Sequence, residues 1–400
     1  MTTLKKLVKK MGQTLSEPVT TKTSACCRDS NFLVGSSCMQ GWRIKMEDCH
    51  VHILALPDDP EASFFAVYDG HGGATMSLHA GKHLHEYITR TPEYKKGQIV
   101  EAMEQGFLEL DKAMQADAAL RADRAGTTVI AVLIKDNILY CANAGDSRAV
   151  ASVHGEAVSL SRDHKPFLED ERRRIEAAGG WVEFNRVNGH LALSRALGDF
   201  KFKWNNNKSA EEQIVTAFPE VQKFEITDDW EFVILACDGI WDVMSSEEVI
   251  DFLRESIATA RQNDPDLLPG IEAVYPDEIC EELINQCLAP DALMGTGCDN
   301  MTVVLVCLLH GKPSLQLELQ CQRLPRKRAD RPKNELRYRN HSSSASSDAE
   351  NDNIAESEDN EDNSAEEQSA TGDKTEQTNS TEEKLVEKIM SNLWPDPTKK

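Results

Sequence analysis

The chain has 400 residues, of which 40% are hydrophobic, and a formal net charge of −23 at pH 7. Such an acidic chain is a poor candidate for general binding of nucleic acids, which requires a positive surface. Its eleven cysteines form no CxxC pair, and no run of about 20 apolar residues is present, so we expect a reduced protein of the cytoplasm or nucleus without a membrane span.

Residues 1–30 are polar, and we expect them to form a flexible arm. The segment from Met11 to Ser16 matches the pattern for N-myristoylation, but Gly12 is internal in this chain and could be acylated only if Met11 were the first residue. We therefore expect an unmodified arm.

Residues 31–312 predict one folded domain. Apolar, β-branched runs of strand length recur through it, at residues 64–68, 127–134, 138–142, 149–153, 232–237 and 301–308. Helical spacing of apolar residues recurs as well, over residues 99–114, 168–178, 245–253 and 276–288. Ser245 and Glu248 form a capping box at the start of the third of these helices. Short turns join neighbouring strands and the helices come in pairs, which favours antiparallel sheets covered by helices over a parallel sheet.

Residues 313–400 predict a disordered tail that is first basic and then acidic. Residues 323–339 hold eight Lys and Arg against two acids, whereas the last 60 residues hold 16 acids against 5 bases, a net of −11. Such composition buries too little apolar surface to offset the entropy of ordering. Apolar residues return at helical spacing over 382–394, where a docking helix and a helix without a partner are both compatible with the pattern. The basic stretch is compatible with a nuclear localisation signal or with a solvated linker.

Several acids lie at the ends of apolar runs. They are Glu47-Asp48, Asp69 before Gly70 and His71, Asp238 before Gly239, and Asp299 before Asn300. A carboxylate at the tip of a buried strand is costly unless its charge is compensated, and several in one cleft would repel each other. Divalent cations are the simplest remedy, and ligands that offer only oxygen suit Mg²⁺ or Mn²⁺. The first prediction is therefore a carboxylate-held metal site that performs hydrolysis.

Each of these signals alone has an ordinary explanation. Taken alone, the segment around Asp69 is compatible with a turn and Asp146 with a turn acid between two strands. The segment around Glu47 is compatible with a helix start or with the end of a surface strand. His79, His83 and His85 have the spacing of metal ligands but also that of an ordinary helix face. Cys49 and Cys237 flank acids, and we interpret both as packing residues because no partner that would activate a thiolate lies nearby.

Taken together the segments are specific. In chain order they read RxxMED, DGHGG, GTT, GDSR, DHKP, SRALGD, CDGIWDV and DNMTV. This order resembles the metal-dependent Ser/Thr protein phosphatases of type 2C, and the resemblance runs from about Val34 to Leu309. It implies an α+β fold, a four-layer α/β/β/α sandwich of two antiparallel sheets flanked by helix pairs. The link over residues 261–275 is longer than usual for the family and predicts a surface insertion.

The resemblance also implies roles for single residues. A centre of two Mg²⁺ or Mn²⁺ ions would use Glu47, Asp69, the Gly70 carbonyl, Asp238 and Asp299. Asp48 would orient metal-bound waters, Arg43 would bind the phosphate, and His71 would be the general acid. Asp163 matches the ligand of a third, weaker ion. The role of Asp199 stays open.

The implied activity is hydrolysis of phosphoserine and phosphothreonine in phosphorylated proteins by a hydroxide that bridges the two metals, carried out by a monomer. One alternative is a pseudophosphatase or scaffold with the same fold, which would have lost metal carboxylates that this chain retains. Another is a two-metal phosphohydrolase that acts on nucleotides or small metabolites.

Overall fold

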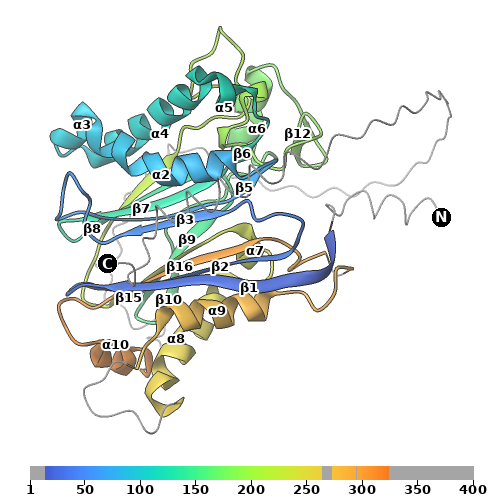
Figure 1. Ribbon diagram of the computed structural model, residues 1–400. Coiled ribbons are helices and arrows are strands. Elements are labelled where there is room, and N and C mark those ends of the chain that lie inside the picture. The colour runs from blue at the N-terminus through green and yellow to red at the C-terminus, as the bar shows by residue number, and fades with distance from the viewer. Residues whose placement is uncertain (1–13, 264–272, 294, 324–400) are drawn as a thin grey trace, which may run out of the picture. The chain divides into compact units, whose positions relative to one another are not determined.

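Two antiparallel sheets stacked face to face form the centre of the described chain, and helices cover the outer face of each (Figure 1). This computed structural model describes residues 14–263, 273–293 and 295–323. They belong to a compact unit that extends to residue 326, whereas a second unit, residues 327–400, lies outside the described part. The predicted α+β sandwich is confirmed.

The strands of the described residues are arranged as follows. The six-stranded sheet has the order β1 (Thr14–Arg28), β2 (Phe32–Arg43), β16 (Met301–Leu308), β15 (Trp230–Ala236), β9 (Arg148–Val153) and β10 (Glu156–Ser159). The five-stranded sheet has the order β14 (Glu220–Glu225), β8 (Ile138–Ala144), β7 (Val129–Lys135), β4 (Ser63–Tyr68) and β3 (Cys49–Ile53). Two small sheets are built from two-residue strands: β13 (Leu197–Gly198), β6 (Gly126–Thr127) and β5 (Gly70–His71) in one, β11 (Val182–Glu183) and β12 (Arg186–Val187) in the other.

Four long helices make the outer layers. On the five-stranded sheet lie α2 (Thr75–Arg90) and α4 (Ile99–Ala116), and on the six-stranded sheet lie α8 (Ser246–Asn263) and α9 (Pro276–Cys287) (Figure 1). The shorter elements are α3 (Pro92–Lys95), α5 (Ala118–Ala122), α6 (Glu169–Ala177), α7 (Asp238–Trp241), α10 (Ser314–Cys321) and the 3-10 turn η1 (Phe200–Phe202). None of the helices in the described ranges has both the length and the hydrophobicity that a membrane span requires.

The position of strand β15 between two hydrophobic cores explains why its sequence is continuously apolar. Val233 and Leu235 point into the core between the two sheets. Phe232 and Ile234 point the other way, into the core between the six-stranded sheet and helices α8 and α9. Because successive side chains of a strand face opposite sides, a strand with a core on each side needs an apolar residue at every position.

The expectation of a flexible arm over residues 1–30 is wrong for residues 14–28, which form β1. None of its side chains is fully buried, so the hydrophobic alternation that reveals a strand is weak. As an edge strand it is held by backbone pairing with β2, for example Cys26 opposite Gly35, and polar side chains are tolerated there. Residues 1–13, including Gly12, lie outside the described residues.

The predicted start of the disordered tail at residue 313 is wrong. Residues Ser314–Cys321 form α10, which buries Leu317 and Cys321. The Arg254 guanidinium donates to the carbonyls of Gln320 (3.3 Å) and Arg323 (2.9 Å). These bonds give partners to carbonyls at the C-terminal end of α10 that have none within the helix. The predicted helix over 382–394, the basic stretch from 324 onward and most of the 261–275 insertion lie outside the described residues.

The capping box predicted at residues 245 and 248 is present at the start of α8. Ser245 N donates to Glu248 Oε2 (2.8 Å), and Glu248 N donates to Ser245 Oγ (3.2 Å). We expect Ser245→Ala to lower the free energy of unfolding by about 1 kcal/mol, because the Glu248 N–H loses its acceptor. Urea denaturation would measure it. Thr259→Ala in the interior of the same helix should cost no stability, since alanine is the better helix former. Equal losses in the two variants would contradict a specific cap.

Candidate metal centre

Three carboxylates meet where strands of both sheets end. Asp69, Asp146 and Asp238 each offer an oxygen, and these oxygens all lie within 4.8 Å of one another. Strands β4 and β8 both pair antiparallel with β7, so they run the same way and end at the same edge, which carries Asp69 and Asp146. Asp238 follows β15, whose last residue, Ala236, pairs with Arg148 two residues beyond Asp146. The topology thus gathers acids that are far apart in the sequence.

The electrostatics of this group favour a bound cation. Burial, followed by the charge of Asp238, raises the pKa of Asp69 well above its ordinary value. Burial, followed by the charge of Asp146, does the same to the pKa of Asp238. Lys165 donates to Asp146, but one ammonium cannot offset three carboxylates of which one is buried and two are half-buried. A set of ligands made only of oxygen in such a place fits Mg²⁺ or Mn²⁺.

Gly70 lets the Glu47 segment approach the group. A Cβ on residue 70 would lie 2.2 Å from the Glu47 carbonyl oxygen and 2.9 Å from Ser77 Oγ, so a side chain cannot be accommodated there. The Ser77 hydroxyl donates to the same Glu47 carbonyl. The resemblance implied a role only for the Gly70 carbonyl, and the structure adds a steric reason for glycine at this position.

Asn300 ties the Glu47 segment to Asp299. Its Oδ1 accepts from Glu47 N (2.9 Å), and its Nδ2 donates to the Lys45 carbonyl (3.0 Å). Glu47 and Asp299 are not members of the group of three. The charge of Asp299 nevertheless contributes to the raised pKa of Asp69, so it lies in the same electrostatic field.

Arg43 lies beside Asp299. Its Nη2 donates to Asp299 Oδ2, and the side chains are 44% and 31% exposed, which leaves the guanidinium open to a ligand from solution. Burial lowers the pKa of Arg43, but the charges of Asp299, Asp238 and Asp69 raise it, so Arg43 interacts electrostatically with two members of the group as well as with Asp299.

Asp48 has one free oxygen. Thr302 Oγ1 donates to its Oδ2 (2.7 Å), while its Oδ1 is buried without a hydrogen-bond partner among the described residues. Burial raises the pKa of this carboxyl to about 7. An orphaned acceptor of this kind is suited to a water molecule, in line with the role predicted for Asp48.

Asp163 is not part of the group. Arg148 donates to both of its oxygens, from Nε (3.0 Å) and from Nη2 (2.9 Å), so its charge is already compensated. The acid that the structure adds instead is Asp146, which sequence analysis interpreted as a turn residue. Its signal was present in the sequence, because Asp146 follows an apolar strand run as Asp69 and Asp238 do.

His71 is paired with Asp199, the residue whose role the sequence left open. Its Nε2 lies 2.5 Å from Asp199 Oδ2, and because an ionised carboxylate only accepts hydrogen bonds, Nε2–H is the donor. The small sheet makes this pair: β5 carries His71, β6 runs beside it, and β13 leads into Asp199. A Cβ on Gly126 of β6 would lie 2.3 Å from Asp199 Oδ2 and 2.5 Å from His71 Nε2. Only glycine leaves room for the pair.

The cysteines and histidines that could compete as nucleophiles or metal ligands have structural roles as packing residues. Burial raises the pKa of Cys49 to about 12 and that of Cys237 well above its ordinary value, so neither is a thiolate at neutral pH. His79 packs against His83 along α2 in a tilted arrangement with ring centroids 4.7 Å apart, and His85 packs against Phe64.

The sequence and the fold are similar to those of known proteins. Residues 32–293 match the sequence model of a family described as Protein phosphatase 2C. A probable protein phosphatase 2C of Caenorhabditis elegans is 60% identical over 314 residues, which cover 78% of this chain and 85% of the relative. Protein phosphatase 2C homolog 3 of Schizosaccharomyces pombe is 50% identical over 305 residues, 75% of this chain and 70% of the relative. A crystal structure of a phosphatase from Toxoplasma gondii superposes with a TM-score of 0.58 at 26% identity and covers 72% of this chain and 96% of that one.

Proposed function

Because the chain belongs to the protein phosphatase 2C family of serine/threonine phosphatases, we propose that it hydrolyses phosphoserine and phosphothreonine at the carboxylate group described above. The observation that carries the proposal is the meeting of Asp69, Asp146 and Asp238 at one edge of the sandwich. The chain retains every carboxylate of the implied metal site, which speaks against a pseudophosphatase, and no observation favours nucleotides or small metabolites as substrates.

Two Mg²⁺ or Mn²⁺ ions, when bound, would supply an activated water and the positive charge that a phosphoryl group requires. We propose that Asp69, Asp238, Asp299, Glu47 and the Gly70 carbonyl would hold them. For a third, weaker ion we propose Asp146 in place of Asp163, since the latter is already bound on both oxygens by Arg148. Asp48 would accept a hydrogen bond from a water at its free Oδ1.

The other residues would orient the substrate and move a proton. Arg43 would bind phosphoryl oxygens through its fork of donors, which matches phosphate geometry. His71 would protonate the departing serine or threonine oxygen. Since Asp199 holds Nε2, the proton that reaches the substrate would come from Nδ1. Asp199 acts through His71 and is therefore a positioning residue.

Turnover of phosphopeptides with Mn²⁺ or Mg²⁺, and with EDTA as control, tests this function. A panel of phosphorylated metabolites and nucleotides should be hydrolysed far more slowly. Turnover that persists in EDTA, or a preference for small metabolites, would refute the proposal.

Arg43→Lys tests the phosphate contact. Lysine keeps the charge but lacks the fork, so we expect KM for a phosphopeptide to rise about tenfold, and Arg43→Ala to raise it further. Inorganic phosphate should inhibit both variants more weakly than it inhibits the wild type. An unchanged inhibition constant for phosphate would remove Arg43 from the site.

We also propose that one chain carries the whole site, acts on phosphorylated proteins, and works in a reducing compartment, the cytoplasm or the nucleus. The last point is supported by the cysteines, all eleven of which are free thiols.

A further inference from the structure

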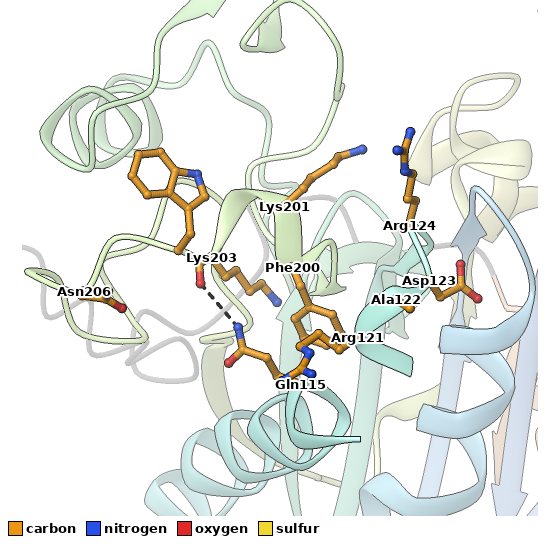
Figure 2. Close-up of a pocket in the computed structure, with 10 residues that line it drawn as sticks. Gln115, Arg121, Ala122, Asp123, Arg124, Phe200, Lys201, Lys203 and Asn206 are labelled. Carbon is orange, nitrogen blue, oxygen red and sulfur yellow. Dashed lines mark hydrogen bonds between the residues drawn. The ribbon is translucent and has the colours of Figure 1, made fainter. Parts of the chain in front are cut away.

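A cationic pocket, drawn in Figure 2, lies beside Asp199, the partner of His71. It encloses about 560 Å³ between the α4–α5 region and the segment that follows β13. Its walls include Arg121, Arg124, Lys201, Lys203 and the exposed ring of Trp204. In a chain of net charge −23, four cations around one cavity are an unusual local excess of positive charge.

These cations differ in whether they already have hydrogen-bonding or ionic partners within the protein. Lys203 is 6% exposed, and its Nζ donates to Asp111 Oδ1 (2.7 Å) and to the Ala196 carbonyl (2.8 Å), so it is part of the wall. Arg121 and Arg124 are exposed, and neither forms an ion pair with a carboxylate of the described chain. Asp123 also lines the pocket, and its Oδ1 accepts from Ala125 N (3.0 Å).

Local hydrogen bonds hold the pocket in shape. Asp117 caps α5, the helix that carries Arg121, by accepting from Ala119 N (2.7 Å) and Leu120 N (3.2 Å). Gln115 Nε2 donates to the Lys203 carbonyl (3.4 Å), the dashed line in Figure 2, and so joins α4 to the opposite wall. A site whose walls are fixed loses little entropy when a ligand binds.

The pocket is close to the residues proposed to protonate the leaving group. Lys201 Nζ lies 3.9 Å from Asp199 Oδ1, and Asp199 is the partner of His71. Arg124 is two residues from Gly126, so their Cα atoms are at most about 7 Å apart. An anion held by Arg124 or Lys201 would lie on the order of 10 Å from His71, a span that an extended peptide covers in about three residues.

We propose that this pocket binds the phosphate of a second phosphorylated residue in the substrate, about three residues from the one that is hydrolysed. The inference rests on the proposed function and narrows it to a preference for multiply phosphorylated segments. The guanidiniums of Arg121 and Arg124 have no ion pair among the described residues, and the Lys201 ammonium makes only a long ionic contact there, of 3.9 Å with Asp199. Together they match the double negative charge and the several acceptor oxygens of a phosphate better than they match a single carboxylate. Trp204, 62% exposed, offers apolar surface to the peptide between the two phosphates.

The test compares matched peptides on the full chain with Mn²⁺. Each peptide carries one phosphothreonine and, three residues to either side, alanine, glutamate or a non-hydrolysable phosphonate analogue of phosphoserine. We expect the phosphonate to lower KM on the order of tenfold relative to alanine in at least one register, with kcat little changed and a smaller gain for glutamate. The variant Arg121→Gln/Arg124→Gln should lose this gain and keep the KM of the alanine peptide.

A charge-matched control separates a pocket from a general field. Lys82→Gln/Lys112→Gln changes two exposed lysines on α2 and α4, removes the same net charge, and should keep the gain. The proposal fails if the phosphonate gives no gain in either register, if glutamate gains as much, or if the two double variants behave alike. Turnover of the alanine peptide alone tests the proposed function. Anisotropy of a labelled phosphonate peptide in EDTA tests the pocket without turnover.

Discussion

Asp69→Asn is expected to lower phosphopeptide turnover about 10³-fold at fixed Mn²⁺, a loss of ~4 kcal/mol in transition-state stabilisation. The same holds for Asp238→Asn. Both acids belong to the group of three converging carboxylates, and an amide offers a weaker, uncharged oxygen to a cation. Near-normal turnover of either variant would contradict the assignment.

A thermal readout distinguishes lost metal from a lost fold. Mn²⁺ should raise the Tm of the wild-type chain, because an ion that binds only the native state stabilises it, and this rise should shrink in Asp69→Asn. In EDTA the variant should melt no earlier than the wild type, since one of several mutually repelling charges has gone. A full Mn²⁺ response in the variant would show that Asp69 holds no ion.

Asp146 and Asp163 provide a matched pair of controls. Asp146→Asn removes a member of the buried group, whereas Asp163→Asn removes an acid that Arg148 already neutralises. When Mn²⁺ is titrated, the turnover of Asp146→Asn should respond less to the Mn²⁺ concentration than the turnover of Asp163→Asn does. The reverse order would restore Asp163 as the ligand of the third ion.

His71→Asn should lower turnover of a phosphopeptide about 10²-fold, the usual contribution of a general acid. The diagnostic is the leaving group. A serine or threonine oxygen departs poorly without a proton, whereas p-nitrophenolate departs readily, so hydrolysis of p-nitrophenyl phosphate should fall only a few-fold.

The His71–Asp199 pair can be broken either from a neighbouring residue or at one of the two partners. Gly126→Ala places a methyl group where His71 Nε2 and Asp199 Oδ2 now meet, and Asp199→Asn removes the carboxylate. Both should reproduce the leaving-group signature of His71→Asn in weaker form. Equal losses with the two substrates would point to a general disturbance of the site and not to proton transfer.

The sequence predicted the site where chemistry coincides with strong strand patterns. Asp69 and Asp238 each follow a long apolar run, so their convergence could be anticipated. Asp146 follows a similar run, but its short turn between two strands invited a simpler interpretation. The partnership of His71 with Asp199 depends on two-residue strands, which are too short to show any periodicity.

Weak local patterns also explain why the sequence did not predict strand β1 and helix α10. Strand β1 lies at a sheet edge and depends on backbone pairing, which leaves no mark on the side-chain pattern. In α10 the leucines at 315, 317 and 319 alternate as in a strand, yet only Leu317 is buried, while Leu315 and Leu319 are 47% and 44% exposed. Its helix is fixed by contacts with distant Arg254, which local sequence does not encode.

Strand β15 has a consequence for how the protein can be divided. Its two faces belong to two different cores, and its end delivers Asp238 to the carboxylate group. Neither the α8–α9 layer nor the five-stranded sheet is an accessory that could be trimmed away, because each covers one face of the same strand. A shortened form that kept a single sheet would lack either Asp238 or both Asp69 and Asp146, so both sheets are needed to complete the site.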